Sequence, residues 1–447
     1  MSPPNNDETL PVVACDVFVI GGGPAGSTAA ALLSERGFDV VLAEKERHPR
    51  FHIGESLLPM NMPLLDKLGV REKVDAIAMY KYGAEFNSPQ HDKSVTFDFS
   101  NAWDKSFPLA YQVKRSEFDQ ILFDHCVDKG TRAMQECQVT AVEIRGASGA
   151  LVRTRAVDGT WQSWKARFLI DASGRDTVLA THFGIKQKNR KHNSAALYAH
   201  FAGACRLPGR DEGNISVFWF DHGWFWFIPL RDGITSVGAV CWPYYLASRR
   251  TDPSTFLLET IELCPALAER MRDARMIVSA TATGNYSYQS RRMTGDGYIM
   301  LGDAFAFVDP VFSAGVYLAM NSAFLGADVV QSHLTDPVRT AALMRSYDRK
   351  VRHGVKNFSW FIYRMTSPAM RALFMSPDNR FRVQEAVLSL LAGDLFRGTP
   401  IYASLRAFKV LYYVLSILLL KRSAAAWLRR RRSIRDAGDL SLNGTKA

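Results

Sequence analysis

The chain has 447 residues, 47% of them hydrophobic and 22% charged, which is ordinary for a globular protein and long enough for two or three structural units. Its formal net charge is +11, and residues 401–447 alone contribute +8, because ten basic residues lie there with only two acids. The rest of the chain is too weakly basic to suggest a nucleic-acid partner. The six cysteines and ten histidines are scattered, which argues against a disulfide framework and a zinc site, so we expect no metal.

The N-terminus, residues 1–14, is polar and contains prolines, and it lacks the basic and then apolar order of a signal peptide. No apolar run reaches the length that a membrane-spanning helix needs. We therefore expect a disordered start and a cytoplasmic protein, which the absence of paired cysteine spacings also favours.

Residues 15–46 have the pattern of a strand, a glycine-rich turn, a helix and a second strand. The turn contains Gly-x-Gly-x-x-Gly directly before the helix, and an acid closes the second strand. Such glycines let the backbone approach a pyrophosphate on the helix N-terminus, and the acid accepts hydrogen bonds from ribose hydroxyls. The residues predicted to bind a dinucleotide are Gly21, Gly23, Pro24, Ala25, Gly26 and Glu44.

Two further pairs of glycine and acid indicate which dinucleotide is bound. DASGR covers residues 171–175, and Gly302-Asp303 precedes a later helix. A flavin has a ribityl chain beyond its pyrophosphate, and an acid near a second helix start suits those hydroxyls and the ring edge. Only one glycine-rich fingerprint is present, so no separate nicotinamide domain is evident and FAD is the favoured cofactor.

The segment GWFWFIPL, residues 223–230, is apolar on both faces of a predicted strand. Alternation places Trp224, Trp226 and Ile228 on one face and the two intervening phenylalanines on the other, before Pro229 ends the strand. A strand that is apolar on both faces is usually buried inside a large sheet. The pattern alone therefore predicts a core strand.

The remaining pattern completes an α/β chain. Aromatic-rich alternation predicts a sheet at 190–245, followed by a helix at 254–272, a strand and long helix at 298–330, and helices from 338 to about 435. We expect a discontinuous FAD-binding domain of Rossmann type, an inserted mixed β-sheet substrate domain, a C-terminal helical region and a disordered tail. The predicted boundaries are 15–80, 104–185 and 280–345 for the FAD-binding domain, 81–103 and 186–279 for the substrate domain, 346–435 for the helical region and 436–447 for the tail.

Together these motifs resemble the FAD-dependent aromatic hydroxylase superfamily and, within it, the flavin-dependent halogenases. The resemblance extends from about residue 15 to about residue 395. Motifs general to the superfamily are GGGPAG at 21–26, Arg115 in RSEFD, DASG at 171–174 and GDAFAFVDPVFSAGV at 302–316. Motifs more specific to the halogenases are HIGES at 52–56, Lys81 in YKYGAEF and WFWFIP at 224–229.

The resemblance implies an enzyme that uses FADH2, O2 and chloride or bromide, and a separate flavin reductase as partner. The Trp pair is implied to keep the organic substrate away from the flavin. Lys81 is implied to hold hypohalous acid or to become a haloamine, although a lone Lys near a turn is more often an ordinary surface residue. The resemblance also implies that Arg115, Asp303 and Gly315 contact the cofactor.

The halide is implied to lie near the backbone N–H groups of Ser313, Ala314 and Gly315, because an amide nest at a helix start binds anions. The same residues also fit an ordinary helix start with Ser as its cap. In tryptophan halogenases this loop carries a Glu, and here Phe312 takes that place. The departure disfavours free tryptophan and favours phenols, resorcinols or pyrroles, either free or tethered to a carrier protein whose acidic surface would suit a basic enzyme.

Two alternatives stay open. The first is a flavin monooxygenase or a polyprenoid reductase, although the latter carry Tyr-x-Trp-x-Phe-Pro and a Cys before Gly-Glu, where this chain has Trp224 and Ile53. The second is a flavin-binding protein that holds a partner or a membrane through its basic tail. The apolar run at 410–420 is too short to span a bilayer, and we expect 405–420 to pack against the body. For 427–435, peripheral contact with anionic lipid competes with such packing.

Overall fold

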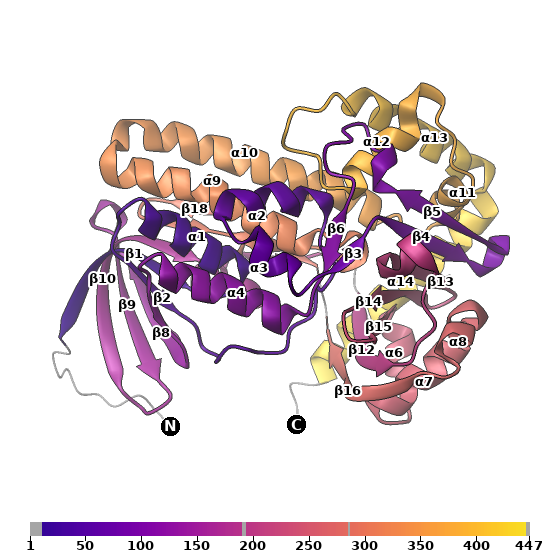
Figure 1. The fold of residues 1–447 in the computed structure, drawn as a ribbon, viewed down its shortest axis with the longest axis horizontal. Coiled ribbons are helices and arrows are strands. Elements are labelled where there is room, and N and C mark those ends of the chain that lie inside the picture. The colour runs from indigo at the N-terminus through magenta and orange to yellow at the C-terminus, as the bar shows by residue number, and fades with distance from the viewer. Residues whose placement is uncertain (1–10, 190–193, 285–286, 444–447) are drawn as a thin grey trace.

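Two large β-sheets organise the computed structural model, which describes residues 11–189, 194–284 and 287–443 (Figure 1). In the first sheet five adjacent strands, including the one that leads into the glycine-rich turn, run parallel, and three further strands pair antiparallel with their neighbours. In order, its strands are β18 (Thr294–Gly295), β19 (Tyr298–Met300), β10 (Trp161–Asp171), β1 (Val12–Ile20), β2 (Val40–Ala43) and β7 (Arg132–Met134), with β9 (Ala150–Ala156) on β10 and β8 (Cys137–Ile144) on β9.

The centre of this sheet is buried on both faces, as continuous apolar strands require. Residues 17–20 of β1 are almost fully buried, and β1 pairs in parallel with β2 and β10. The Ala-rich α1 (Pro24–Glu35) packs closely against α4 (Arg115–Asp128) and α9 (Gly315–Thr335), because small side chains permit a close approach. In Figure 1, α10 (Pro337–Ile362) lies alongside α9.

The second sheet is antiparallel except where β13 pairs in parallel with β4. One of its faces adjoins the main core, and the other forms a separate core under α7 (Pro253–Glu262) and α8 (Pro265–Met271). In order, its strands are β16 (Arg275–Thr283), β12 (Ala195–Ala202), β15 (Ile234–Cys241), β14 (Gly223–Pro229), β13 (Ile215–Phe220), β4 (Gly83–Ser88) and β5 (Lys93–Asp98).

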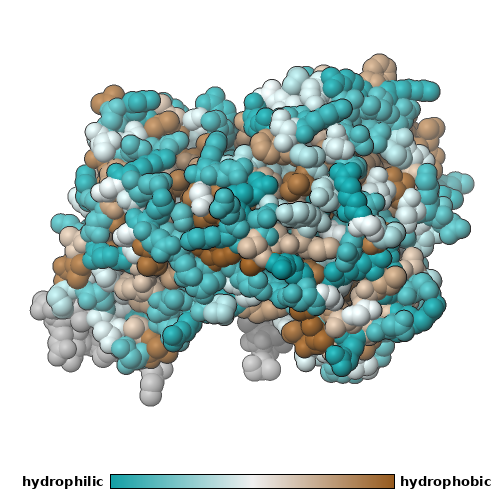
Figure 2. Space-filling view, viewed as in Figure 1, coloured by the Kyte–Doolittle hydropathy of each residue, from teal (hydrophilic) through white to brown (hydrophobic). Residues whose placement is uncertain are grey.

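Smaller elements complete the described chain. Two short sheets join β3 (Met79–Lys81) to β6 (Ala110–Gln112), and β17 (Tyr288–Ser290) to β11 (Lys186–Lys188) and β20 (Ala306–Phe307). Over the face seen in Figure 2, apolar side chains are mostly scattered among polar ones. The other helices are α2 (Met62–Leu68), α3 (Arg71–Asp75), α5 (Val178–His182), α6 (Pro243–Ala247), α11 (Pro368–Met375), α12 (Val383–Leu391), α13 (Tyr402–Leu418) and α14 (Leu420–Asn443).

Several predicted boundaries differ from those observed. β1 already begins at Val12, because its first residues pair with β10, whereas the disordered start was predicted to end at 14. The helix predicted at 254–272 is two helices, since Cys264 leaves helical geometry and Pro265 begins a new helix. The predicted boundary at 346 falls inside α10, which contains no proline after its first residue.

The ends of the predicted substrate domain and tail also differ. β11 belongs to the small sheet with β17, and β16 continues to Thr283, so the strands of the second sheet lie in 83–98, 195–241 and 275–283. The tail predicted to be disordered from 436 is helical as far as Asn443, where α14 ends. That segment lacks proline, and its glycine lies within the helix.

Candidate active site

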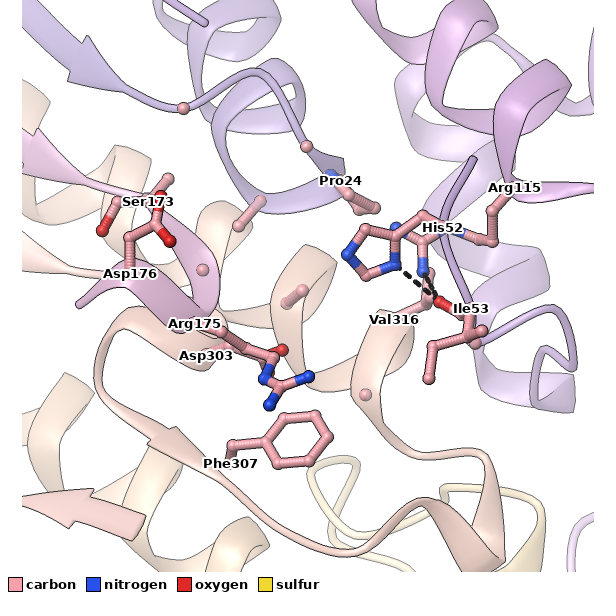
Figure 3. A pocket seen from close by; sticks show the side chains of 18 of the residues that line it. Pro24, His52, Ile53, Arg115, Ser173, Arg175, Asp176, Asp303, Phe307 and Val316 are labelled. Atoms are coloured by element: carbon pink, nitrogen blue, oxygen red, sulfur yellow. Dashed lines mark hydrogen bonds between the residues drawn. The ribbon is translucent and has the colours of Figure 1, made fainter. Parts of the chain in front are cut away.

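A cavity of about 530 Å³ opens at the carboxyl ends of β1, β2 and β10, beside the starts of α1 and α9 (Figure 3). This edge of a parallel sheet is where such folds bind ligands. Gly26, Pro229 and Lys81 do not line the cavity. The predicted site residues that do line it are Gly21, Gly23, Pro24, Ala25, Glu44, Arg115, Trp224, Trp226, Ile228, Asp303, Ser313, Ala314 and Gly315.

The start of α1 offers backbone N–H groups to this cavity. Gly23 caps the helix without a side-chain hydrogen bond, and the first turn carries no acid. Gly21 has φ of +98°, a conformation that favours glycine. A Cβ on Gly26 would lie 1.8 Å from the carbonyl oxygen of Gly21, so Gly26 acts by letting the helix approach the turn. The geometry fits a pyrophosphate on the helix N-terminus.

Glu44 lies at the end of β2 and is almost fully buried. One of its oxygens accepts the N–H of Gly22 at 2.7 Å, and the other accepts the N–H of Glu46 at 2.9 Å. These bonds fix the carboxylate at the cavity wall. Each carboxylate oxygen can accept more than one hydrogen bond, so Glu44 can still accept ribose hydroxyls.

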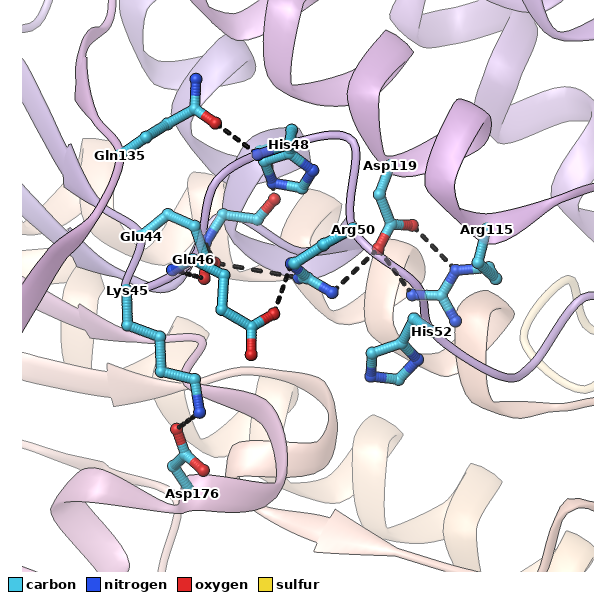
Figure 4. A network of polar contacts seen from close by, with 12 residues as sticks. Glu44, Lys45, Glu46, His48, Arg50, His52, Arg115, Asp119, Gln135 and Asp176 are labelled. Atoms are coloured by element: carbon cyan, nitrogen blue, oxygen red, sulfur yellow. Dashed lines mark hydrogen bonds and ion pairs between the residues drawn. The ribbon is translucent and has the colours of Figure 1, made fainter. Parts of the chain in front are cut away.

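A polar network joins this acid to Arg115 through two residues that the sequence analysis did not select, Arg50 and Asp119 (Figure 4). Arg115 binds both oxygens of Asp119, at 2.8 and 2.9 Å, and donates a third hydrogen bond to the carbonyl of Ile53. Burial opposes the charge of Asp119, but Arg115 and Arg50 hold the pKa of this carboxyl below its ordinary value. Arg115 therefore fixes HIGES itself through the Ile53 carbonyl. The i, i+4 spacing of Arg115 and Asp119 is the sequence feature from which their pairing could have been predicted.

The two later acids have different positions. Asp303 lines the cavity, and burial raises the pKa of its carboxyl to about 7 despite the nearby Arg115 and Arg175. Asp171 is fully buried and accepts the backbone N–H groups of Ser173 and Leu179, which shapes the DASG turn. Asp303 is thus the acid that can meet a flavin, whereas Asp171 supports the wall.

The start of α9 forms the opposite side of the cavity. Ser313 has a left-handed φ of 56° and donates its N–H to the carbonyl of Pro310 at 2.8 Å. The amides of Ala314 and Gly315 are therefore the donors left for an anion, since the first N–H groups of a helix have no partner within it. Phe312 is buried, with its ring centroid 6.5 Å from that of Phe361, so this position carries no carboxylate.

β14 is the strand of the second sheet that forms one wall of the cavity. Trp224, Trp226 and Ile228 line the cavity, while the intervening phenylalanines lie in the core under α7 and α8, as the alternation predicts. The indole centroids are 6.1 Å apart, and the N–H of Trp226 donates to Ser236 at 3.2 Å. Across the strand pair, Gly238 leaves room for the Trp226 ring, which a Cβ there would approach to 2.2 Å.

Lys81 lies behind the cavity, at the end of β3, and is 1% exposed. Its Nζ donates to Ser56 Oγ at 2.9 Å and to the carbonyl oxygen of Leu57 at 3.1 Å. Nζ also lies 5.4 Å from the centroid of the Phe99 ring. Burial alone lowers the pKa of this amine to about 7. Ser56 itself lines the cavity, so one side chain connects the flavin side with the lysine.

Glu55 also lines the cavity and was not selected from the sequence. It is 2% exposed and contacts the imidazole of His200 at 2.7 Å, while the exposed Phe51 packs against the same imidazole. HIGES thus supplies an acid and a hydroxyl side by side. The HIGES motif could have drawn attention to Glu55, but its partner His200 on β12 could not be inferred from that motif.

These features fit FAD. The amides at the start of α1 suit a pyrophosphate, Glu44 suits a ribose, and Asp303 with the α9 amides suits the far end of the molecule. The volume falls within the range of small-molecule and cofactor cavities, about 300–1,000 Å³.

Comparisons with known proteins agree with this assignment. The model of a family described as "FAD binding domain" matches residues 14–358. A pyrrole-2-carbonyl peptidyl-carrier protein chlorinase of Pseudomonas fluorescens is 29% identical over 411 residues, which cover 86% of this chain and 90% of that protein. A tryptophan 2-halogenase of Chondromyces crocatus is 34% identical over 344 residues, which cover 74% of this chain and 64% of that protein. The solved structure of a myxobacterial chondrochloren halogenase is 31% identical in sequence, with a TM-score of 0.76, and the match covers 91% of this chain and 97% of that one.

Proposed function

Since the chain belongs to the flavin-dependent halogenases, we propose that it halogenates an electron-rich aromatic ring by way of Lys81. Membership confirms the Rossmann-like α/β fold, FAD as the cofactor and the oxidoreductase class. The observation that carries the finer proposal is the Lys81–Ser56 hydrogen bond, because Ser56 lies at the cavity wall and Lys81 lies behind it.

When bound in its reduced form, FAD supplies hypohalous acid from O2 and a halide. The chain separates that oxidant from the organic substrate. Trp224 and Trp226 occupy the wall where an aromatic substrate would otherwise meet the flavin, which disfavours direct hydroxylation. The small oxidant can pass this wall, whereas a ring cannot.

Lys81 receives the electrophilic halogen. Because burial lowers the pKa of its amine to about 7, a large part of the side chain is neutral at working pH and nucleophilic enough to form a haloamine. Ser56 and the Leu57 carbonyl hold Nζ in one position. A fixed donor favours a single site of halogenation on the substrate.

We propose a phenol, resorcinol or pyrrole as the substrate, either free or tethered to a carrier protein. The buried Phe312 provides no carboxylate at the position where tryptophan halogenases have Glu, which favours a ring activated by its own heteroatom. The name of the Pseudomonas relative, a pyrrole-carbonyl chlorinase acting on a peptidyl-carrier protein, supports a tethered pyrrole as one option.

The test is turnover of purified protein with FAD, a separate flavin reductase, NADH and O2. Chloride or bromide would be supplied with free and carrier-bound phenols, resorcinols, pyrroles and indoles, and mass spectrometry would detect halogen isotope doublets. We expect a doublet from the wild type, none from Lys81→Ala, and an unchanged rate of flavin oxidation in that variant.

A second variant tests the connection through Ser56. Ser56→Ala removes one acceptor of Lys81, so halogenated product should fall about tenfold, while free hypohalous acid in a chemical trap should rise. As a matched control, Ser332→Ala removes another buried hydroxyl within α9 and should change neither quantity. Hydroxylated or reduced products without halogen would instead indicate a monooxygenase or a reductase.

A further inference from the structure

The C-terminal half of α13 is apolar on its outward side. Val410, Val414, Ile417 and Leu418 are 62%, 51%, 68% and 75% exposed, and their i, i+4, i+7 and i+8 spacing places them on one face of the helix. The opposite face is also apolar, and its Phe408 is buried against the body. The predicted packing of 405–420 is therefore correct for only one side of the helix.

This exposure continues into α14. Leu420, Trp427 and Leu428 are more than half exposed, and the two helices meet at a bend of 94°. Surface helices of globular proteins normally present polar residues to solvent, and contiguous apolar surface marks an interaction site. We call this region the α13–α14 apolar surface, and it comprises Val410, Leu411, Tyr413, Val414, Ile417, Leu418, Leu420, Trp427 and Leu428.

Basic residues flank this surface along the chain. Between 402 and 435 the sequence contains no Asp or Glu. Lys421 and Arg422 are exposed directly after the bend, and Arg429, Arg431 and Arg432 are exposed on the next turns of α14. Arg431 lies 4.3 Å from the ring centroid of Trp427, so cationic and aromatic side chains are interleaved at the edge of the apolar residues.

This combination distinguishes between possible occupants. A second copy of the chain would bring two basic rims together in a two-fold interface, where like charges repel. Among the described residues no single helix has the length and apolarity to cross a membrane; α13 with residues 420–429 meets that test only as a bent pair. An anionic bilayer surface accommodates both features, because aliphatic side chains enter the acyl boundary while Lys and Arg meet the headgroups.

We propose that the α13–α14 apolar surface binds the surface of an anionic lipid bilayer, with the helices lying in the interface. The FAD cavity is built from other elements, so this attachment is independent of the halogenation proposed above. It would hold the enzyme where lipophilic aromatic compounds gather.

The test is flotation of the full-length, FAD-loaded protein with vesicles of phosphatidylcholine alone or mixed with phosphatidylglycerol. We expect binding to the mixed vesicles, at least about tenfold weaker binding to phosphatidylcholine alone, and a loss of binding with added salt. A double variant, Ile417→Glu with Leu418→Glu, should abolish binding. Lys421→Gln with Arg422→Gln should weaken it about tenfold.

The matched control is Val338→Glu on α10, since Val338 is 91% exposed but lies outside this surface, and it should bind as the wild type does. Circular dichroism and FAD content show that each variant is folded. Equal recovery of the wild type with and without vesicles would overturn the proposal. The proposal would also be overturned if the wild type formed a dimer that does not bind vesicles and that the Glu variants dissociate. Binding to an acidic carrier protein but not to vesicles would overturn it as well.

Discussion

Burial governs the stability contribution of Lys81 as well as its chemistry. Among the residues that the structure describes, the hydrogen-bond acceptors of this amine are Ser56 and Leu57, which contribute a hydroxyl and a carbonyl but no carboxylate. A buried ammonium group in such surroundings has a lower pKa than it has in water. In the role proposed for Lys81, this loss of folding free energy accompanies a reactive amine, which is a common compromise at functional positions.

The loss of folding stability caused by burying Lys81 should appear as a pH-dependent gain in the free energy of unfolding of the variant Lys81→Met. The folded wild type loses the Lys81 proton near pH 7, whereas the ordinary value is 10.5, so the unfolded chain binds more protons between these values. Stability of the wild type therefore rises with pH in that window. The variant lacks this penalty and should exceed the wild type by up to several kcal/mol at pH 7, with the difference vanishing as pH approaches 10.5.

Urea unfolding of both proteins at a series of pH values measures this difference. The control Lys67→Met removes an exposed lysine of α2 and should show no such pH-dependent gain. A gain for Lys81→Met that is constant with pH would mean that packing, rather than the charge, had changed.

At the scale of elements, the pairing of β14 with β15 sets the position of the Trp wall. Trp226 lies opposite Gly238, and a methyl group there would meet the indole at 2.2 to 2.5 Å. Gly238 has no left-handed φ, so its role is steric. Gly→Ala within a strand normally adds about 0.5–1 kcal/mol of stability. A loss of stability in Gly238→Ala would therefore indicate the steric clash with the Trp226 ring.

We predict that Gly238→Ala destabilises the protein by about 1–3 kcal/mol and weakens FAD binding, because the indole must move toward the cavity. Adding Trp226→Phe, whose smaller ring restores the space, should recover part of both losses. A double-mutant cycle on unfolding and on FAD fluorescence titration measures the coupling. Additive losses would show that the two positions do not interact.

Elements were more predictable from the sequence than the places where they meet. The two faces of β14 follow from alternation, and the α1 turn follows from its glycines. Lys81 meets Ser56 only because β3 pairs with β6 and Ser56 bridges to Gln112, pairings that local pattern does not specify. The prediction that 405–420 packs against the body was wrong for one side of α13 for a related reason. In a helix that is apolar all round, the sequence does not show which side a neighbouring element covers.

At the scale of the whole molecule, the cavity belongs to both large sheets. Gly21 and Glu44 come from the first sheet, and Trp224 and Ile228 come from the second. A ligand that binds this folded cavity and not the unfolded chain stabilises both parts at once, by about 2.7 kcal/mol at a hundredfold excess over Kd. FAD should therefore shift the unfolding of the two sheets together.

We predict one cooperative transition that moves to higher temperature with FAD, and no shift in Gly26→Ala. The added methyl would lie 1.8 Å from the Gly21 carbonyl and push α1 away from the turn, although Ala is otherwise the better helix former. Gly284→Ala, whose methyl meets open space, should keep the full shift. Circular dichroism and Trp fluorescence would be followed in one thermal scan, because tryptophans lie in both sheets, Trp164 in the first and Trp224 and Trp226 in the second. Two separated transitions, with only one responding to FAD, would mean that the cofactor stabilises the first sheet alone and that the Trp wall is held by its own core.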